Sequence, residues 1–487
     1  MRSAGPGALA RCRDRVVLLD DGDTLPVDER KVDPRGPRRR PPARLSRRLQ
    51  LALVLVASVA MTAGSSVAEA APPPTDEVGG VVRPASPPGD GARTALDALL
   101  FLPRTIVQIV VIASTATASF FEDQQVVPRT QALLGSEDGT VRVTPTLSLA
   151  SGLRPDVGAR MTARAGSFAS MLRMSIVGPN HYVAEARLLQ ALGKTGHTQL
   201  VLEGYQQRRS GLGFGGVGED PRNDPRNAFL PGRQGTEGVF LESRQRLIAG
   251  VASRVANDYE LLLSSSFQRR RIEDSPDDGA GSLANTFVPG TVPGAYDRSE
   301  RTYTEVAIRR DTRAVRGPPA AGLLVEGYAG ASQDVHGTYA PAVHAGGRVA
   351  WFVSVVRKTT IISPRFTLDV VGPIGEKSLP FREYAYASGF RGSDGRVDHV
   401  AALASLDYRW QLRQYVAARL FVDVTTVANE VTSLDVKHLA WATGFGLDLH
   451  SSATQIGRVG FSYSPDAFQL VLVFGLADPG FGDRQHR

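Results

Sequence analysis

Apolar and polar residues alternate with a period of two from about residue 140 to residue 476. Successive side chains of a β-strand point to opposite faces of the sheet, so this alternation predicts strands with one apolar and one polar face. In one such stretch Leu420, Val422 and Val424 share a face, whereas Asp423 lies on the other. The pattern therefore predicts an all-β region over this part of the chain.

Sixteen candidate strands follow from the alternation. They span residues 140–150, 156–165, 169–178, 181–192, 197–208, 238–250, 257–271, 301–311, 320–330, 344–357, 361–371, 397–412, 413–424, 438–450, 455–464 and 467–476. Three connections are long, 211–237, 273–300 and 372–396, and the links between them are mostly short. Long loops at one end, tight turns at the other and an even number of strands are typical of outer-membrane barrels.

Aromatic residues indicate what the apolar face meets. Tyr408 and Trp410 end the apolar face of a strand whose opposite face carries Asp407. A soluble sandwich also alternates, but its aromatic residues need not gather at strand ends. A transmembrane barrel has an apolar outside bounded by aromatic girdles, and its closed sheet satisfies every backbone group. The predicted fold class is thus all-β, a transmembrane antiparallel β-barrel over residues 139–476, with a C-terminal tail at 477–487.

The N-terminal region begins with two segments of different character. Residues 1–43 have the Pro/Arg-rich composition of a disordered extension, which indicates a start codon placed too far upstream. Residues 44–70 contain a basic stretch, a short apolar core and small residues at Ala68 and Ala70, which predicts a secretory signal peptide cleaved after Ala70. The alternative is a cytoplasmic extension before a membrane anchor, but the apolar core is shorter than the roughly 20 residues that a span requires.

Two further segments precede the predicted barrel. Residues 71–92 form a Pro/Gly-rich linker with no periodicity. Residues 93–138 place apolar residues at helical spacing, interrupted at Pro103, and predict a short periplasmic helix that lies against the protein or the membrane surface.

Net charge argues against a nucleic-acid partner. The chain carries a formal +7, but residues 1–50 hold 13 Lys/Arg and 7 Asp/Glu, a net of +6. Taking that segment and Glu69 away leaves +2 for the remainder, which offers no basic surface for phosphates. The only cysteine, Cys12, precedes the predicted mature chain, so the sequence offers no cysteine site for a metal or a redox group, and we expect no cofactor.

Three short motifs follow one another along the barrel region. They are IRRDTR with PPAAG between Ile308 and Gly322, FRG at residues 390–392, and LFVDV between Leu420 and Val424. In their order and spacing the sequence resembles the BamA/TamA superfamily of outer-membrane barrels, the bacterial surface antigens, over most of residues 100–476. That family's loop motif is a small apolar residue followed by Arg-Gly and an aromatic residue, whereas here the aromatic residue comes first.

The resemblance implies a site inside the barrel. In the family the sixth extracellular loop folds back into the lumen, so Arg391 is expected to meet Asp423, with Asp407 as the alternative partner. The expected loop and wall residues are Phe390, Arg391, Gly392, Asp407, Phe421 and Asp423. Taken alone, the motif also reads as an ordinary glycine turn, and Asp423 as a solvated lumenal carboxylate. Gly444 and Gly446 are expected to make room for the inserted loop.

The resemblance also implies a role in inserting, assembling or translocating proteins at the bacterial outer membrane. The expected partners are membrane lipid and nascent outer-membrane or secreted proteins. No polypeptide-transport-associated domain is recognisable before the barrel. The alternative is a passive porin-like channel or a lipid-handling barrel. An outer-membrane hydrolase is a third candidate, but no nucleophile, base and orienting group stand in a recognisable arrangement, so we expect no enzyme.

Two expectations concern single segments. Residues Ala467–Leu476 should pair with Thr140–Ala150 and close the barrel. The glycine-rich stretch Gly211–Asp220 predicts a flexible external loop.

Overall fold

The computed structural model describes only part of the chain. The described residues are 75–78, 81–84, 140–150, 156–193, 197–232, 235, 237–256, 258–276, 281–313, 321–356, 360–413, 416–450 and 455–474. The predicted extension, signal peptide, helix and C-terminal tail lie outside them. Among the described residues, no helix is long and apolar enough to cross a membrane.

A short hairpin lies within the Pro/Gly-rich segment. Strands β1 (Thr75–Val78) and β2 (Val81–Pro84) pair antiparallel. Their sequences, TDEV and VVRP, do not alternate between apolar and polar residues, which explains why the alternation did not predict them.

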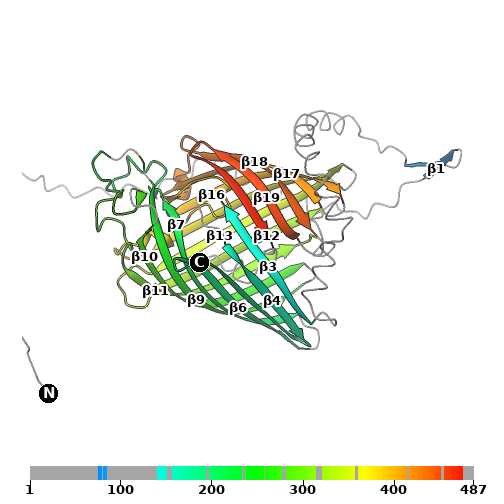
Figure 1. The fold of residues 1–487 in the computed structure, drawn as a ribbon, viewed down its shortest axis with the longest axis horizontal. Helices are drawn as coiled ribbons and strands as arrows, with labels where there is room; N and C mark the ends of the chain where they lie inside the picture. Colours follow the sequence, from blue (N-terminus) through cyan, green and yellow to red (C-terminus); the bar gives the residue numbers. More distant parts are fainter. Residues whose placement is uncertain are drawn as a thin grey trace, which may run out of the picture. The chain divides into compact units, whose positions relative to one another are not determined.

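The described residues of the barrel region form antiparallel strands joined by turns and loops (Figure 1). The barrel strands are β3 (Val141–Ala150), β4 (Asp156–Ala165), β5 (Phe168–Gly178), β6 (His181–Leu192), β7 (Thr198–Phe214), β9 (Gly238–Arg254), β10 (Tyr259–Asp274), β11 (Arg298–Asp311), β12 (Gly322–Asp334), β13 (Ala342–Val356), β14 (Thr360–Pro373), β16 (Val400–Arg413), β17 (Val416–Ala428), β18 (Ala440–His450), β19 (Gln455–Ser464) and β20 (Ala467–Phe474). Each neighbours the next barrel strand in sequence, and β20 returns to β3, which closes the barrel as predicted.

Within the described residues, the closure between β20 and β3 covers four register pairs. Leu147–Ala150 pair there with Val471–Phe474. The neighbouring pair, β19 with β20, extends from Gly457 to Ser464. The first and last strands therefore meet over the shortest ladder of the described barrel.

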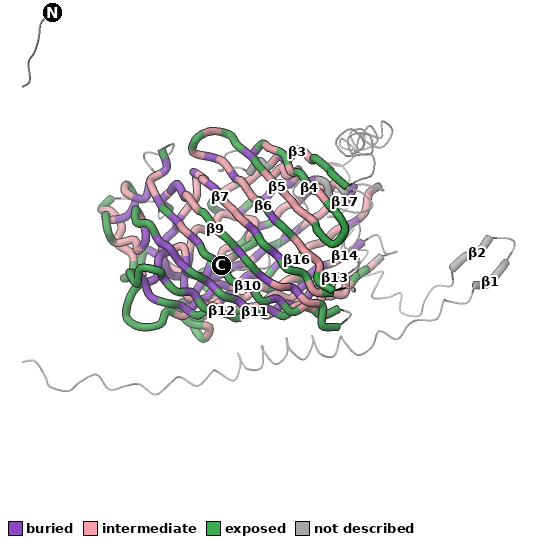
Figure 2. The backbone as a smooth tube through the Cα atoms, turned by 90° about the horizontal axis from the view of Figure 1, so that it is seen from below, coloured by how far each residue is buried: buried purple, intermediate pink, exposed green. Residues whose placement is uncertain are grey.

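Burial changes along the strands of the wall (Figure 2), as expected where successive side chains point to opposite sides. On β10 the outward Leu261 and Leu263 are exposed, whereas the inward Leu262 and Ser264 are buried. Charged side chains line the lumen and exposed apolar side chains cover the outside. This distribution is the inverse of that in a soluble protein. The alternation thus gives the surface of a transmembrane barrel.

The strands extend further toward the long loops than the sequence predicted. The ladder of β7 with β9 continues to Phe214 and Gly238, so the glycine-rich stretch begins as strand rather than loop. Beyond it, β8 (Gly216–Val217) pairs in parallel with β15 (Arg396–Val397). Strand pairing supplies backbone hydrogen bonds that glycine composition does not reveal, so the prediction of a flexible loop there was wrong.

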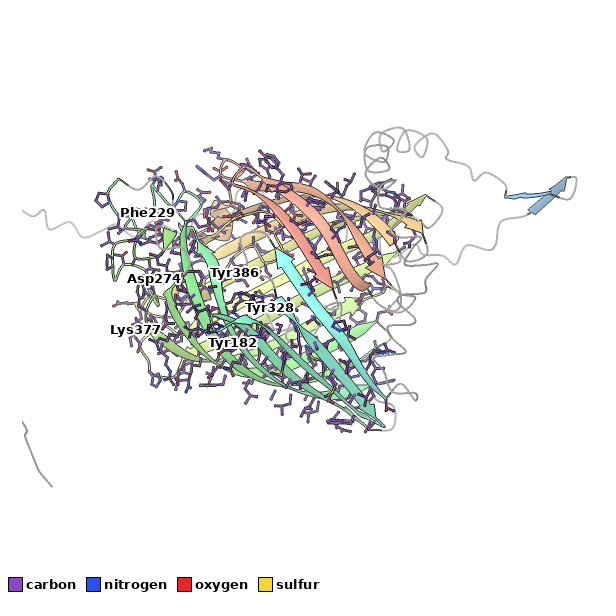
Figure 3. All side chains as sticks on the ribbon, in the orientation of Figure 1. Tyr182, Phe229, Asp274, Tyr328, Lys377 and Tyr386 are labelled. Atoms are coloured by element: carbon purple, nitrogen blue, oxygen red, sulfur yellow. The ribbon has the colours of Figure 1, made fainter. Side chains whose placement is uncertain are left out.

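An apolar cluster joins the long loops at this end of the barrel. Its buried members include Phe214 of β7, Phe240 of β9, Phe287 of the β10–β11 connection, and Leu379 and Phe381 of the β14–β16 connection. The rings of Phe214 and Phe381 are 4.5 Å apart between centroids. Figure 3 places the labelled Phe229, Asp274 and Lys377 at this same end.

Candidate functional site

The connection between β14 and β16 carries the FRG motif. It leaves β14 at Pro373, makes a turn of 3-10 helix at Phe381–Glu383 (η2), and passes through Arg391 before β15. The tip of the loop contacts the inner wall at β16 and β17. An earlier part of the loop contacts the inner wall at β9 and β10.

Arg391 lies between two carboxylates of the wall. Its Nε and NH2 donate to the two oxygens of Asp423 at 2.8 and 2.6 Å. Its NH1 donates to Oδ1 of Asp407 at 2.6 Å, and NH2 lies 3.3 Å from Oδ2. The backbone N–H of Arg391 also donates to Asp423, at 3.1 Å. A planar guanidinium can serve both carboxylates at once, so Asp407 and Asp423 are joint partners rather than alternatives.

Strand register brings these groups together. Asp407 of β16 stands opposite Phe421 of β17, and Asp423 lies two residues further along the same inner face. The Arg391 guanidinium carbon lies 3.7 Å from the centroid of the Phe421 ring. A cation over an aromatic face is attracted by the ring quadrupole, more strongly when it is desolvated. The wall therefore provides two carboxylates that bind Arg391 and an aromatic ring on which its guanidinium packs.

Glycines allow this close packing. A Cβ at Gly444, the register partner of Phe421, would lie 2.6 Å from that ring and 2.1 Å from the carbonyl oxygen of Phe461. A Cβ at Gly392 would lie 2.7 Å from the Phe390 ring and 2.9 Å from Cβ of Ala442. Gly444 thus makes room for the ring beneath the arginine, and Gly392 lets the loop tip approach β18.

The site is well shielded. The Asp423 side chain is 0% exposed, and those of Asp407 and Arg391 are 16% and 19% exposed. Burial alone would lower the pKa of Arg391, but its hydrogen bonds to Asp423 and Asp407 outweigh burial and raise that pKa above its ordinary value. The guanidinium remains charged at every working pH. Its contact with Asp407 and Asp423, the arginine clasp, therefore persists over that range.

A second anchor, which the sequence analysis missed, holds the start of the loop. Arg270 of β10 donates to Glu383 at 2.9 Å and lies 3.0 Å from Glu242 of β9. Arg382 reaches the same Glu242 at 3.3 Å. Strands β11 to β14 separate this wall from the wall that holds Arg391. The loop therefore crosses the lumen between two charged anchors.

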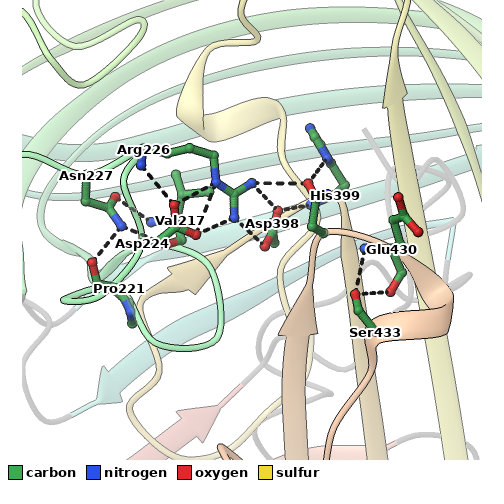
Figure 4. Close-up of polar contacts among 10 residues, drawn as sticks. Val217, Pro221, Asp224, Arg226, Asn227, Asp398, His399, Glu430 and Ser433 are labelled. Carbon is green, nitrogen blue, oxygen red and sulfur yellow. Dashed lines mark hydrogen bonds and ion pairs between the residues drawn. The ribbon is translucent and has the colours of Figure 1, made fainter. Parts of the chain in front are cut away.

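A third anchor ties the loop to its neighbours outside the lumen. Arg226, of the β7–β9 connection, donates to both oxygens of Asp398 at 2.8 and 2.9 Å and to Asp224 (Figure 4). It also lies 3.4 Å from the amide oxygen of Asn429, just past the end of β17. Three separate connections meet at one guanidinium.

The sequence contained a partial signal for these anchors. Glu242 and Arg270 occupy lumen-facing positions of their strands, which the alternation gives directly. Their partners Arg382, Glu383 and Asp398 lie on a loop with no period, so only the folded structure shows which wall each one meets.

Fold and site together define the class of this protein. It is a sixteen-stranded antiparallel barrel of the outer-membrane type, with a loop folded into its lumen and clasped by an arginine. In its motifs and in the position of that loop it resembles the BamA/TamA superfamily.

Comparison with known proteins gives the following neighbours. No protein-family model matches the sequence, and no curated protein matches it. Among solved structures, BamA from Haemophilus ducreyi lacking POTRA domains 1–3 is 12% identical with a TM-score of 0.49, over 69% of this chain and 70% of that one. CdiB from Acinetobacter baumannii is 11% identical with a TM-score of 0.41, over 68% of this chain and 60% of that one. CdiB from Escherichia coli is 10% identical with a TM-score of 0.43, over 68% and 63% respectively. The chain thus spans less than two thirds of either CdiB chain.

Proposed function

We propose that this chain is an outer-membrane barrel of the BamA/TamA type that helps to insert, assemble or translocate outer-membrane or secreted proteins, without catalysis and without a cofactor. The observation that carries the proposal is the clasp of Arg391 on Asp407 and Asp423. It lies at the motif through which the sequence resembles that superfamily, and it holds in the lumen the loop that the resemblance assigns there.

The short closure between β3 and β20 supports the same proposal. A strand edge that lacks a partner is a template for another strand. Within the described residues, β3 and β20 pair over Leu147–Ala150 and Val471–Phe474. When this ladder opens, the edges of β3 and β20 are offered to a client strand, which is the step that an insertion role requires.

A passive channel is the second candidate, because the lumen is lined with charge. Arg187 with Glu203, Arg309 with Glu326 and Arg458 with Asp448 are lumenal pairs of the kind found in water-filled barrels. The loop that crosses the lumen between two anchors opposes free diffusion, so insertion remains the preferred function.

The test is an insertion assay with a closure that can be locked. Cysteines at positions 148 and 473, which are register partners, join β3 to β20 when oxidised. The protein is reconstituted into liposomes, and the folding rate of a urea-unfolded eight-stranded outer-membrane barrel is followed on gels. We expect acceleration by the reduced protein and its loss on oxidation, with recovery on reduction.

The matched control joins two strands away from the closure. Cysteines replacing Leu263 and Val306, register partners on β10 and β11, lock a ladder that has no need to open. Insertion should be unaffected by oxidation of this pair. Absence of acceleration by the wild type, together with steady ion conductance, would contradict the proposal and favour a passive channel.

A further inference from the structure

A shallow depression of about 470 Å³ lies in the wall formed by β5, β6, β7, β9 and β10. On the outer face its floor consists of Ala184, Ala186 and Gly204, and its apolar sides include Leu172, Leu247 and Phe267. Leu247 and Phe267 are 53% and 39% exposed. Small residues at the floor and larger ones at the sides make a furrow in the surface that faces the bilayer.

Gly204 leaves the furrow open. A Cβ built at this position meets no atom within 4 Å. Its register partners on either side are Ala186 and Leu247, so the floor continues across neighbouring strands. An apolar groove of this kind on a membrane-facing wall is the shape that an acyl chain fills.

Arginines border the furrow on the side of the long loops. Arg269 lies at its edge and pairs with Glu300 at 2.9 Å, while its side chain stays 43% exposed. In the next row toward the loops, Arg208, Arg271 and Arg298 also project outward, and their side chains are 33%, 62% and 54% exposed. Each has a carboxylate neighbour but retains exposed donor groups.

Charge in this border is unbalanced. Among the described residues its four arginines pair with two carboxylates, Glu273 and Glu300, which leaves a net +2 in this border. Register places Arg208 opposite Ser243, Ser243 opposite Arg271, and Arg271 opposite Arg298. Three strand spacings separate the ends of this row, about 14 Å. One phosphate group cannot reach every arginine in the row, whereas a headgroup with two phosphates can.

We propose that this furrow and its arginine border bind a lipid of the outer leaflet whose headgroup carries more than one phosphate. An acyl chain lies over Gly204 and Ala186, and the phosphates accept hydrogen bonds from the arginines of this row, Arg208 at one end and Arg271 and Arg298 at the other. Arginine suits phosphate because its planar fork donates two parallel hydrogen bonds. The inference rests on the proposed outer-membrane location, in which the long loops face outward.

The probe is bisphosphorylated lipid A, compared with monophosphorylated lipid A and with zwitterionic phosphatidylethanolamine. Retention on the detergent-solubilised full chain is measured by native mass spectrometry. We expect the bisphosphorylated lipid to be retained best. Arg271→Gln combined with Arg298→Gln should weaken its binding about tenfold, as expected for the loss of charge-assisted contacts. Equal retention of all three lipids by the wild type would overturn the proposal.

Two variants complete the test. Arg310→Gln changes an outward arginine at the opposite rim, beside Tyr259, and should leave binding within about twofold of wild type. Gly204→Leu places an apolar side chain in the furrow, at a position where a Cβ meets no atom within 4 Å, and should also weaken binding. Unchanged binding by Gly204→Leu, or equal loss in Arg310→Gln, would contradict the assigned site. Heat-modifiability on gels shows that each variant is folded, and a wild type that accelerates insertion but binds no lipid A would leave the proposed function standing.

Discussion

At the scale of single residues, the Arg391 guanidinium combines a charge that persists at all working pH values with a planar fork. Lysine carries the charge but lacks the fork, so it cannot serve Asp407 and Asp423 together. Because Asp423 is fully buried, removal of Arg391 leaves an uncompensated carboxylate in the wall. The cost of losing the arginine therefore exceeds the ordinary value of an exposed ion pair.

We expect Arg391→Ala to destabilise the barrel by about 3–5 kcal/mol, as for the breaking of other buried pairs. Asp423→Ala should have a similar effect, and the double variant should cost much less than the sum of the two, because each single change leaves the other group unpaired. Urea unfolding in lipid vesicles measures the three values. Arg458→Ala removes a lumenal arginine that pairs with Asp448 rather than with Asp407 or Asp423, and it is the control. It should cost less, because Arg409 and Arg419 stay within 4 Å of Asp448. Additive effects would show that the two groups act independently.

Gly444 provides a second test at this scale. Gly444→Ala should cost about 1–3 kcal/mol, since its Cβ would meet a backbone carbonyl and the Phe421 ring beneath Arg391. Gly204→Ala makes the same chemical change on a barrel strand with open space around it, and should stay within about 0.5 kcal/mol. Equal effects of the two substitutions in urea unfolding would contradict the packing described for the site.

At the scale of elements, the β14–β16 connection is held at three places by side chains from different parts of the chain. Arg391 meets β16 and β17, Glu383 meets β10, and Asp398 meets the β7–β9 connection. Ordering a loop of this length costs substantial conformational entropy. The anchors, together with the buried Phe381, offset that cost.

The third anchor, in which Arg226 pairs with Asp398 and Asp224, is expected to weaken in acid. Burial alone would raise the pKa of Asp224, but hydrogen bonds and charge from Arg226 outweigh it and hold that pKa below its ordinary value. A folded-state pKa below the unfolded one gives stability that is present above the ordinary value, about 4, and lost as the pH falls through the lowered value. Amide exchange of the β7–β9 connection, compared between wild type and Arg226→Gln, should differ at pH 6 and converge as the pH falls through the lowered pKa of Asp224, below its ordinary value. A difference that persists at low pH would contradict this assignment.

The sequence predicted the strands well and the loops poorly, for a physical reason. A strand between lipid and a water-filled lumen must alternate apolar and polar residues, so the sequence of β17 already shows that Val422 faces outward and Asp423 faces inward. The loop contacts depend on which wall a non-periodic segment reaches, and nothing local decides that Glu383 meets Arg270. The FRG motif identified Arg391. The sequence predicted Asp423 as its partner with Asp407 as the alternative, whereas the guanidinium binds both.

At the scale of the whole barrel, ladder length differs around the wall. Strands β9 and β10 pair from Arg254 with Glu260 to Phe240 with Asp274, whereas β3 and β20 pair over four residues each. Each ladder residue contributes backbone hydrogen bonds that the bilayer cannot replace. Within the described residues the fewest such hydrogen bonds join the first and last strands, and we expect the barrel to open first there.

Amide exchange in lipid nanodiscs tests this expectation. Residues 147–150 and 471–474 should exchange faster than the central residues of β9 and β10, because local opening there breaks fewer hydrogen bonds. Oxidised cysteines at positions 148 and 473 should slow that exchange. Uniform protection around the barrel would indicate that the closure is as stable as the rest.

The most direct measurement of the central claim, that the β14–β16 loop lies clasped in the lumen, is a crosslink at its tip. The backbone N–H of Ser393 lies 3.4 Å from the Ser464 hydroxyl of β19. Cysteines at these two positions should be joined efficiently by a short thiol crosslinker in intact membranes, whereas a cysteine replacing Ser388, earlier in the loop, should not reach Ser464. Adding Arg391→Ala should reduce the first crosslink. Failure of the Ser393–Ser464 crosslink in the wild-type background, or equal crosslinking from position 388, would show that the loop does not occupy the lumen as described.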